Sequence, residues 1–336
     1  MTGCLNLNIS DISTYFHCAP AAATWISNVY TLAVAMFSLP LGHLADIKGR
    51  RTMIIGESGS GKSVLLMAIL QMLPASAAVS GRAELDGLDL MAAGKTEMRR
   101  LRGRVVSYIP QGSGNSMNPL LTVGFQVGEP LMIHRRFSRR AAVRRACEAL
   151  RSFDLGNEEQ LVRQYPHTLS GGMKQRALIA MGVVNDAPVL FADEPTKGLD
   201  RARISMVTDA FRRLEGKTLL CVTHDLNFAQ ELADQVVVMY ASEEIECGGA
   251  ADFFARPLHP YSQAILRALP KNGLHASAGF APPREDEEAA RGCHYRMRCP
   301  YCTEKCGSRP PMFEAEGRKV RCWRYAPGST EPEKTL

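Results

Sequence analysis

The octapeptide GESGSGKS, at residues 56–63, constrains the fold of this chain more than any other stretch. It fits the pattern GxxxxGK[ST], follows the short apolar run at residues 53–55, and precedes the helix-forming run VLLMAILQML. A strand, glycine loop and helix in this order form a phosphate cradle, because glycines let backbone N–H groups approach phosphate oxygens and a helix N-terminus favours negative charge. The motif predicts a nucleotide site in which Lys62 reaches the β- and γ-phosphates and the Ser63 hydroxyl meets Mg²⁺.

Between residues 53 and 250, short apolar runs alternate with helical patterns, which is typical of a layered α/β domain. The expected strands are residues 53–55, 105–109, 189–192, 219–222 and 236–240. Near-continuous apolar runs suit strands that helices cover on both faces. Residues 139–152 and 170–184 are expected to form helices inserted between the second and third strands. The sequence therefore predicts a three-layer α/β core with a mostly parallel sheet and a helical insertion.

Two further motifs complement the glycine loop. The run VLFADEPT ends in Asp193 and Glu194, side by side at the carboxyl end of an expected strand. Asp193 is placed to hold Mg²⁺ or its water shell, and Glu194 to polarise the water that attacks the γ-phosphate. LSGGMKQR, at residues 169–176, puts a serine and two glycines at a helix start, which makes a second anion site by geometry. Without the glycine loop, the acidic pair would be better interpreted as an ordinary strand end.

Together with Gln111, Asp200 and His224, these motifs occur in the order and approximate spacing of an ABC transporter ATPase subunit, which the chain resembles over about residues 53–250. The resemblance implies a P-loop NTPase (RecA-like) core that binds ATP and Mg²⁺. The nucleotide-binding residues that it implies are Gly56, Glu57, Ser58, Gly59, Ser60, Gly61, Lys62, Ser63, Ser170, Gly171, Gly172 and Asp200. The catalytic residues that it implies are Glu194, His224 and Gln111, and the Mg²⁺ site is Ser63, Gln111 and Asp193.

The resemblance also implies how two such subunits cooperate. Ser170 and the two glycines after it would contact the γ-phosphate that the other subunit holds, so that ATP closes a head-to-tail pair. Gln111 would sense Mg²⁺ and the attacking water while it touches the membrane partner, and His224 would hold the γ-phosphate from the other side. The sequence departs from the family pattern at Met173, where many members have glutamine, and at residues 197–198, where a Ser-Ala pair is commoner.

The C-terminal part narrows the resemblance. LHPYSQAIL, at residues 258–266, and GCHYRMRCPYCTEKC followed by RCW resemble the C-terminal extension of oligopeptide, dipeptide and nickel importer ATPases. By this resemblance, the candidate ligands of a [4Fe–4S] cluster are Cys293, Cys299, Cys306 and Cys322. Cys302 forms a CxxC pair with Cys299, so a Cys₄ zinc site remains an alternative, as do reduced thiols without a metal.

The first 52 residues show a different pattern. Residues 20–41 form an uncharged stretch of 22 residues, about the length that spans a bilayer, and Lys48, Arg50 and Arg51 would keep its far end in the cytoplasm. A buried apolar helix is the alternative interpretation. Residues 8–52 resemble the start of a major facilitator transporter of the drug-exporter type, with GHLADIKGRR similar to its loop signature. This segment supplies one or two of the dozen or more helices of such a carrier, so it cannot transport by itself.

The expected domains are residues 1–52, an ATPase domain at 53–250 with a helical subdomain at 112–184, and a Cys-rich extension at 251–336. The resemblance to importer ATPases implies the ATP-hydrolysing subunit of an importer of peptides or nickel complexes, peripheral at the cytoplasmic face of the inner membrane. The expected partners are membrane permease subunits, an identical or sister ATPase subunit and, indirectly, an extracytoplasmic solute-binding protein. Nucleic acid is not expected, because the arginine pairs within residues 135–145 sit among helix-forming residues and are interpreted as a solvated helix face.

Three alternatives remain open at this point. The first is a membrane carrier fragment with a passenger domain. The second is a fused or truncated chain whose ATPase is impaired. The third is a non-transport ATPase of the same class that acts on nucleic acid or ribosomes. The fused chain would lack the strands and the adenine-stacking aromatic residue that normally precede the glycine loop, which would leave sheet edges uncovered.

Overall fold

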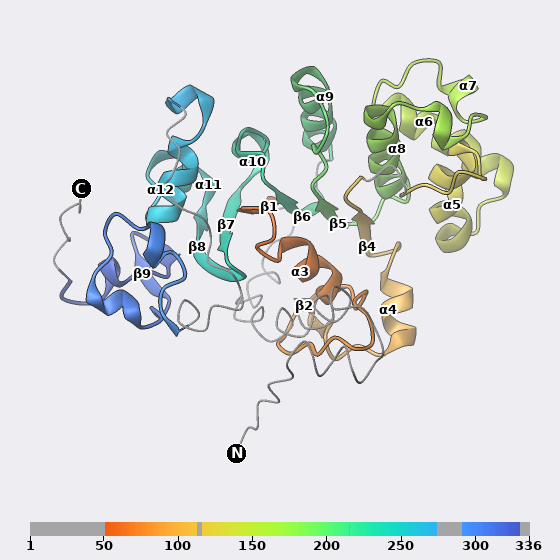
Figure 1. Ribbon diagram of the computed structural model, residues 1–336. Helices are drawn as coiled ribbons and strands as arrows, with labels where there is room; N and C mark the ends of the chain where they lie inside the picture. Colours follow the sequence, from red (N-terminus) through yellow and green to blue (C-terminus); the bar gives the residue numbers. More distant parts are fainter. Residues whose placement is uncertain (1–50, 113–115, 215, 274–290, 330–336) are drawn as a thin grey trace, which may run out of the picture.

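The computed structural model describes residues 51–112, 116–214, 216–273 and 291–329. The candidate membrane span at 20–41 and the carrier-like segment up to residue 50 lie outside the described residues. Within the described part of the chain, no helix has the length and apolar character needed to cross a bilayer. A twisted β-sheet forms the centre of the molecule, with helices above and below it (Figure 1).

The central strands of the sheet are parallel. β1 (Arg51–Gly56) lies between β6 (Thr218–Thr223) and β7 (Gln235–Tyr240), and runs parallel to both. Beyond β6 the parallel sheet continues through β5 (Val189–Asp193) to β4 (Val106–Ile109). All five strands expected from the sequence are present, with bounds that differ from the expected ones by at most two residues.

The sheet is extended on its other side by antiparallel strands that were not expected. β8 (Glu243–Gly249) pairs with β7, β10 (Arg318–Val320) pairs with β8, and β9 (Phe313–Ala315) pairs with β10. The full order is β4-β5-β6-β1-β7-β8-β10-β9. The C-terminal strands thus continue the sheet past β8, and β4 and β9 are its outermost strands among the described residues. Pairing of this kind satisfies backbone groups that would otherwise invite aggregation.

Alternate residues of each central strand pack into two separate cores. In β1, Met53 and Ile55 belong to one core and Ile54 to the other, because successive side chains of a strand point to opposite faces. Helices cover both faces: α3 (Lys62–Ile69) and α4 (Lys95–Leu101) contribute to the core of Ile54, while α9 (Arg201–Arg212) and α10 (Leu226–Leu232) are among the helices that contribute to the core of Met53. The three-layer arrangement predicted from the sequence is confirmed.

A helical insertion lies between β4 and β5, as the sequence indicated. It contains the expected helices α6 (Arg139–Arg151) and α8 (Gly171–Val183), and also α5 (Val123–Arg135) and the short α7 (Glu158–Leu161). The sequence did not indicate α5, which holds Pro130 and two glycines that disfavour a helix. Those glycines permit close packing instead: a Cβ at position 128 would lie 2.8 Å from a backbone oxygen of α6.

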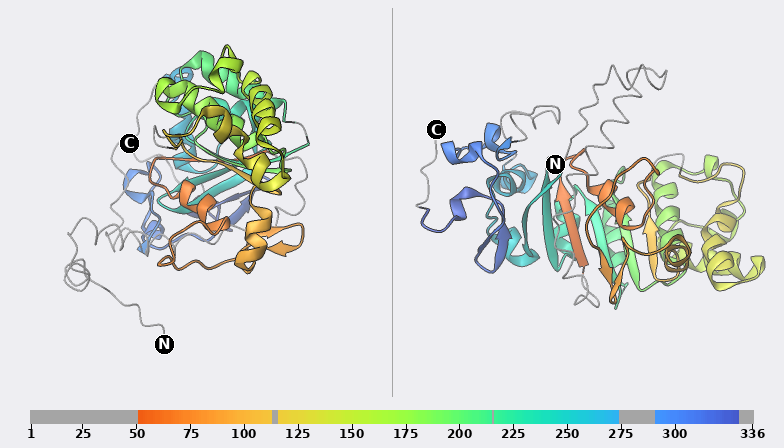
Figure 2. Two further views of the ribbon diagram at one scale, coloured as in Figure 1. Left: turned by 90° about the vertical axis from the view of Figure 1, so that its right-hand side faces the viewer. Right: turned by 90° about the horizontal axis from the view of Figure 1, so that it is seen from below.

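The helical insertion and the C-terminal part occupy opposite ends of the sheet (Figure 2). The C-terminal part contains α11 (Ala250–Ala255) and α12 (Pro260–Arg267), the latter close to the helix expected at residues 261–269. Short 3₁₀ helices follow at Pro270–Asn272 (η3), Arg296–Arg298 (η4), Glu304–Gly307 (η5) and Trp323–Tyr325 (η6), and one more, Pro166–Thr168 (η2), precedes α8. A small separate hairpin joins β2 (Glu84–Leu85) to β3 (Leu88–Asp89) below α3.

Candidate nucleotide site

The glycine loop connects the carboxyl end of β1 to the start of α3, at the middle of the sheet. Gly56 must be glycine, because a Cβ there would lie 2.1 Å from the backbone oxygen of Met239. Gly61 caps α3 in the left-handed region, with φ of 86°, which favours glycine. The loop therefore turns tightly at the end of a buried strand and delivers the start of α3 to the same edge where the other parallel strands end.

Lys62 is buried beneath the loop and bonds to it. Its Nζ donates to the carbonyl oxygen of Gly56 at 3.0 Å and to that of Glu57 at 2.8 Å. Burial lowers the pKa of this ammonium, and the carboxylates of Glu194, Asp193 and Glu57 oppose that effect. The cation is thus held at the loop by acceptors that phosphate oxygens can replace.

The Ser63 hydroxyl and the Asp193 carboxylate contact each other at the carboxyl ends of the parallel strands. Ser63 Oγ donates to Asp193 Oδ1 at 2.8 Å, although the two residues are far apart in sequence. Burial raises the pKa of Asp193, while hydrogen bonds from Ser63 and Tyr108 and the charge of Lys62 counteract the shift. The two oxygen groups predicted to flank Mg²⁺ therefore lie within one hydrogen bond of each other, and oxygen donors are what Mg²⁺ prefers.

Tyr108 is a site residue that sequence reasoning missed. Its hydroxyl donates to Asp193 Oδ2 at 3.3 Å. Tyr108 lies on β4 three residues before Gln111, and β4 pairs with β5 in the register Tyr108 to Phe191. Only the pairing of β4 with the strand that ends in Asp193 reveals this contact, and the order of strands in the sheet is not readable from one sequence.

Glu194 and His224, each predicted to act in catalysis, contact each other. His224 Nδ1 lies 2.5 Å from Glu194 Oε2, and the backbone N–H of His224 donates to the same oxygen at 3.3 Å. Glu194 has a φ of 50°, in the left-handed region that side-chain-bearing residues rarely adopt. Such backbone conformations persist where the surrounding structure imposes them, and they are frequent at functional sites. A carboxylate and an imidazole are thereby brought together beside the Asp193 pair.

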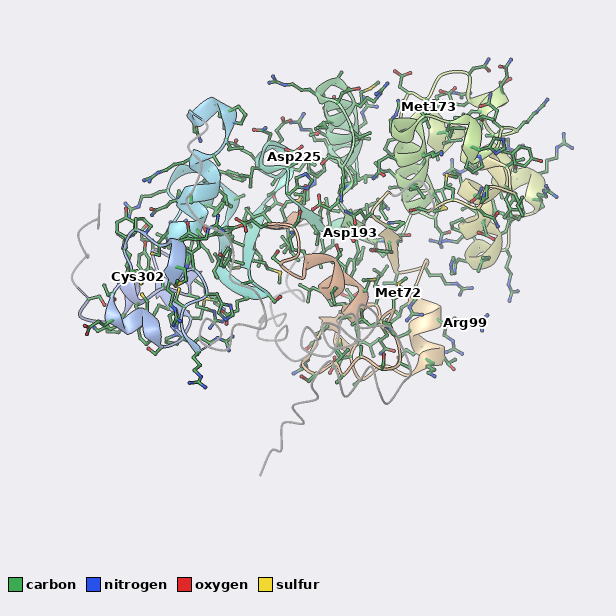
Figure 3. The ribbon with its side chains drawn as sticks, viewed as in Figure 1. Met72, Arg99, Met173, Asp193, Asp225 and Cys302 are labelled. Carbon is green, nitrogen blue, oxygen red and sulfur yellow. The ribbon has the colours of Figure 1, made fainter. Side chains whose placement is uncertain are left out.

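The structure does not bring Ser170 to the glycine loop of its own chain. Ser170 caps α8, where its side chain accepts from the backbone N–H of Met173 at 3.3 Å, and it is exposed, as is Gly171. Figure 3 places Met173 on α8 well away from Asp193 at the centre of the site. Gly172 belongs to the same first turn of α8. Ser170 and Gly171 are therefore accessible to other molecules at the start of α8.

Two other predicted site residues, Asp200 and Gln111, take no part in the contacts described above. Asp200 caps α9 by accepting from Arg203 N–H at 3.0 Å, and its carboxylate pairs with the Arg203 guanidinium at 2.6 Å. Gln111 is half-buried after the end of β4, where its carbonyl oxygen accepts from Ser116 Oγ at 3.3 Å. Ser58, Gly59 and Ser60 complete the glycine loop between Glu57 and Gly61.

The four predicted cluster ligands line one cavity of about 420 Å³ in the C-terminal part: Cys293, Cys299, Cys306 and Cys322. Burial raises the pKa of Cys293 and Cys299 to about 12, and that of Cys322 to about 11, so these thiols are protonated without a metal. Cys302 lies at the surface of this region (Figure 3). Across the described residues, no three potential ligands are close enough together to hold a single metal ion.

Comparison with known proteins identifies the class. Residues 46–197 match the family model described as ABC transporter, and residues 245–306 match the one described as oligopeptide/dipeptide transporter, C-terminal region. Among solved structures, a dimeric post-hydrolysis state of the ATP-binding cassette MJ0796, bound to ADP and Pi, aligns with a TM-score of 0.55 and 28% identity. That alignment covers 61% of this chain and 87% of the cassette. The fold and site are those of an ABC ATPase, an ATP-binding and ATP-hydrolysing class.

Full-length relatives define the family more closely. The chain is 35% identical to the oligopeptide transport ATP-binding protein AppD of Bacillus subtilis, over 83% of this chain and 88% of that protein. It is 39% identical to the dipeptide transport ATP-binding protein DppD of Haemophilus influenzae, over 80% and 84%. It is 33% identical to the oligopeptide transport ATP-binding protein OppD of Escherichia coli, over 95% and 93%. The chain belongs to the family of ATP-binding subunits of oligopeptide and dipeptide ABC transporters.

The comparisons do not support the major facilitator resemblance of residues 8–52. The alignment with OppD covers 95% of the chain, so it must include much of residues 1–50. The match to the ABC transporter model also begins at residue 46, before the domain boundary expected at residue 53. In the structure, Arg51 is the first residue of β1, with its N–H donating to Asp234 Oδ2 at 2.7 Å. Arg51 was assigned to a carrier loop and instead belongs to the ATPase sheet.

Proposed function

We propose that this chain is the ATP-hydrolysing subunit that powers an importer of oligopeptides or dipeptides. The observation that carries the proposal is the pair of contacts around the glycine loop, Ser63 with Asp193 and Glu194 with His224. They unite a cation site and a base beside a phosphate cradle, which is what ATP hydrolysis requires. The relatives reported above are named for peptides, and we therefore favour peptides over nickel complexes as the solute.

Different residues of the chain bind the nucleotide and catalyse its hydrolysis. The loop N–H groups and Lys62 would hold the β- and γ-phosphates, and Ser63 and Asp193 would hold a Mg²⁺ ion that neutralises the phosphate charge. Glu194 orients and polarises the attacking water, and His224 contacts the γ-phosphate from the other side. Gln111 senses the metal and the water from the end of β4. Burial of Lys62 and Asp193 strengthens these interactions, because charges act more strongly on each other away from water.

The site is completed by a second ATPase subunit, identical or sister. Ser170, Gly171 and Gly172 would bind the γ-phosphate held by the partner, in support of which Ser170 and Gly171 are exposed at the start of α8. The MJ0796 cassette was solved as a dimer. Asp200 lies at the start of α9, and we place it at the same interface. ATP binding would close the pair and hydrolysis would reopen it.

We place the chain at the cytoplasmic face of the inner membrane, bound to two permease subunits that receive peptides from an extracytoplasmic binding protein. The ATPase domain runs from Arg51 or earlier to about residue 250, with a helical subdomain at 112–184. The extension at 251–336 follows. Arg51 is included in the ATPase domain because its guanidinium also donates to the carbonyl oxygen of Arg212 at 2.9 Å.

The transport proposal predicts that the chain hydrolyses ATP faster when it works in its complex. The chain, its permeases and its ATPase partner would be reconstituted in vesicles, and phosphate release would be measured with and without peptide-loaded binding protein. We expect a severalfold stimulation by peptide. Stimulation by DNA or RNA, without any effect of permeases and peptide, would contradict the proposal and favour a non-transport ATPase.

A [4Fe–4S] cluster in the C-terminal extension is the second part of the proposal. The donor set fits, because four thiols surround one cavity of about 420 Å³. Such a cluster would supply electron-transfer or structural chemistry, and Cys293, Cys299, Cys306 and Cys322 would hold it.

Metal analysis of the chain tests the cluster. After anaerobic purification we expect about four iron and four sulfide per chain, and loss of most of this iron in a Cys322→Ser variant. Cys302→Ser is the matched control, since Cys302 is exposed and outside the ligand set. One zinc per chain would instead assign a Cys₄ zinc site, and neither metal would leave reduced thiols.

A further inference from the structure

Glu57, the second residue of the glycine loop, is held from three directions. Its carbonyl oxygen accepts from Lys62 Nζ at 2.8 Å. Its backbone N–H donates to the hydroxyl of Tyr261 at 2.9 Å, and its carboxylate accepts from the Arg298 guanidinium at 3.0 Å and 3.3 Å. Tyr261 and Arg298 both belong to the C-terminal part of the chain. That part therefore contacts the residue whose carbonyl positions the ammonium of the phosphate site.

The Arg298 side chain is held in place by its neighbours. Its side chain is only 7% exposed, and the guanidinium lies over the rings of Tyr240 and Tyr295, 5.8 Å and 5.6 Å from their centroids. It also donates to the Tyr240 hydroxyl at 3.3 Å. Burial against aromatic faces limits the rotamers of a long side chain, so little conformational entropy is lost when the ion pair with Glu57 forms.

The tyrosines around Arg298 join three parts of the chain. Tyr240 ends β7, Tyr261 lies on α12, and Tyr295 precedes η4; their ring centroids are 4.6 Å to 5.5 Å apart. Aromatic pairs at these distances pack favourably in tilted and edge-to-face arrangements. The cluster therefore ties α12 and the cysteine-rich segment to the strand next to β1.

The same segment is anchored in the cysteine-lined cavity. Tyr295 and Arg298 lie in sequence between Cys293 and Cys299, both of which line that cavity. The backbone N–H of Cys293 donates to the carbonyl oxygen of Cys306 at 2.9 Å. A change in the geometry of the cavity would therefore move the short segment that carries Arg298.

We propose that Arg298 and Tyr261 are positioning residues for ATP binding, through which the C-terminal extension fixes the phosphate loop. By holding Glu57 at its N–H and its carboxylate, they set the carbonyl that keeps Lys62 in place. The inference rests on the proposed function, since it takes residues 56–63 as the ATP site. It adds a role for the C-terminal extension in the nucleotide affinity of the chain.

This coupling must act in both directions. If the extension raises the affinity for ATP, bound ATP must stabilise the extension by the same factor. Glu57 remains 38% exposed, so the ion pair adds little to the stability of the fold. Breaking the pair at Glu57 is therefore expected to change nucleotide affinity, with the free energy of unfolding nearly unchanged.

Arg298→Gln tests the coupling through MgATP affinity, measured by calorimetry on the full chain. We expect the affinity to fall about fivefold, within the usual range of coupling between sites, and Arg298→Lys to restore part of it. In steady-state hydrolysis, KM rises while kcat changes little. Met297→Gln is the matched control, because Met297 lies in the same turn and is 74% exposed.

A double-mutant cycle separates positioning from a general structural effect. If Arg298 acts through Glu57, the Glu57→Gln/Arg298→Gln double variant loses no more affinity than the more affected single variant. Additive losses would overturn the inference. Tyr261→Phe is a second variant that removes only a hydroxyl, and we expect its MgATP affinity to fall about threefold. It tests the inference if Arg298→Gln does not fold.

Because the coupling is reciprocal, the effect of MgATP on hydrogen exchange in the C-terminal extension is a second measurement. A residue with a purely structural role would not change that effect. MgATP should slow hydrogen exchange of residues 293–299 in the unmodified chain, and should do so much less in Arg298→Gln. Equal affinities of the Arg298→Gln, Tyr261→Phe and unmodified chains would overturn this inference and leave the proposed function intact. Failure of the unmodified chain to bind MgATP would overturn both.

Discussion

Replacement of Glu194 by glutamine is expected to slow ATP hydrolysis at least about 100-fold, since a positioned general base contributes roughly that much or more. Glutamine has the shape of glutamate and still accepts the hydrogen bond from the His224 backbone N–H, so the fold and MgATP binding should be retained. It cannot accept a proton from water at neutral pH. The measurement is steady-state phosphate release at saturating MgATP, together with nucleotide affinity.

Glu231→Gln is the matched control for this experiment. Glu231 also pairs with a cation, Arg212, at 2.6 Å, but its side chain is 51% exposed and lies on α10. We expect its hydrolysis rate to equal that of the unmodified chain. A Glu194→Gln chain that hydrolyses ATP as fast as the unmodified one would show that Glu194 is not the base.

Gly171→Asp is expected to abolish most hydrolysis without preventing MgATP binding. A Cβ at Gly171 meets nothing within 4 Å, so the substitution places no strain on the folded chain. In the closed pair, however, the new carboxylate would face the γ-phosphate held by the partner, and like charges at close range repel strongly where water is excluded. We expect a loss of about 100-fold in hydrolysis by the assembled ATPase pair, with affinity of the separate chain unchanged.

Gly94→Asp provides the control for the added charge. Gly94 precedes α4, and a Cβ there also meets nothing within 4 Å, but α4 lies away from α8 (Figure 1). This variant should hydrolyse ATP normally. If Gly171→Asp did so too, residues 170–172 would have no part in a shared site. If it instead lost MgATP binding as a separate chain, the site would lie within one chain.

The central strands and the phosphate motifs were predictable from the sequence for a physical reason. Strands covered on both faces need nearly continuous apolar residues, so runs such as VLFAD are distinct from the helices around them. The chemistry at their ends is equally local, because Asp193 and Glu194 directly follow a buried strand. The contacts of Ser63 with Asp193 and of Glu194 with His224 follow once the parallel strands end at one edge.

What the sequence did not reveal depends on contacts between distant parts of the chain. α5 forms despite Pro130, because its tertiary packing outweighs its low helix propensity. The strands β9 and β10 are three residues each, too short to show a pattern, and they gain their stability by pairing with β8. Tyr108, Tyr261 and Arg298 reach the site from strand register or from the C-terminal part, and no local motif marks them.

The central claim is that residues 56–63 hold ATP in this chain, and a calorimetric titration of the full chain with MgATP tests it most directly. We expect one nucleotide per chain. In Lys62→Ala, which removes the buried ammonium that bonds the loop, we expect the affinity to fall by at least about 100-fold, as loss of a charge-assisted contact with phosphate predicts. No binding by the unmodified chain, or equal binding by Lys62→Ala, would contradict the account.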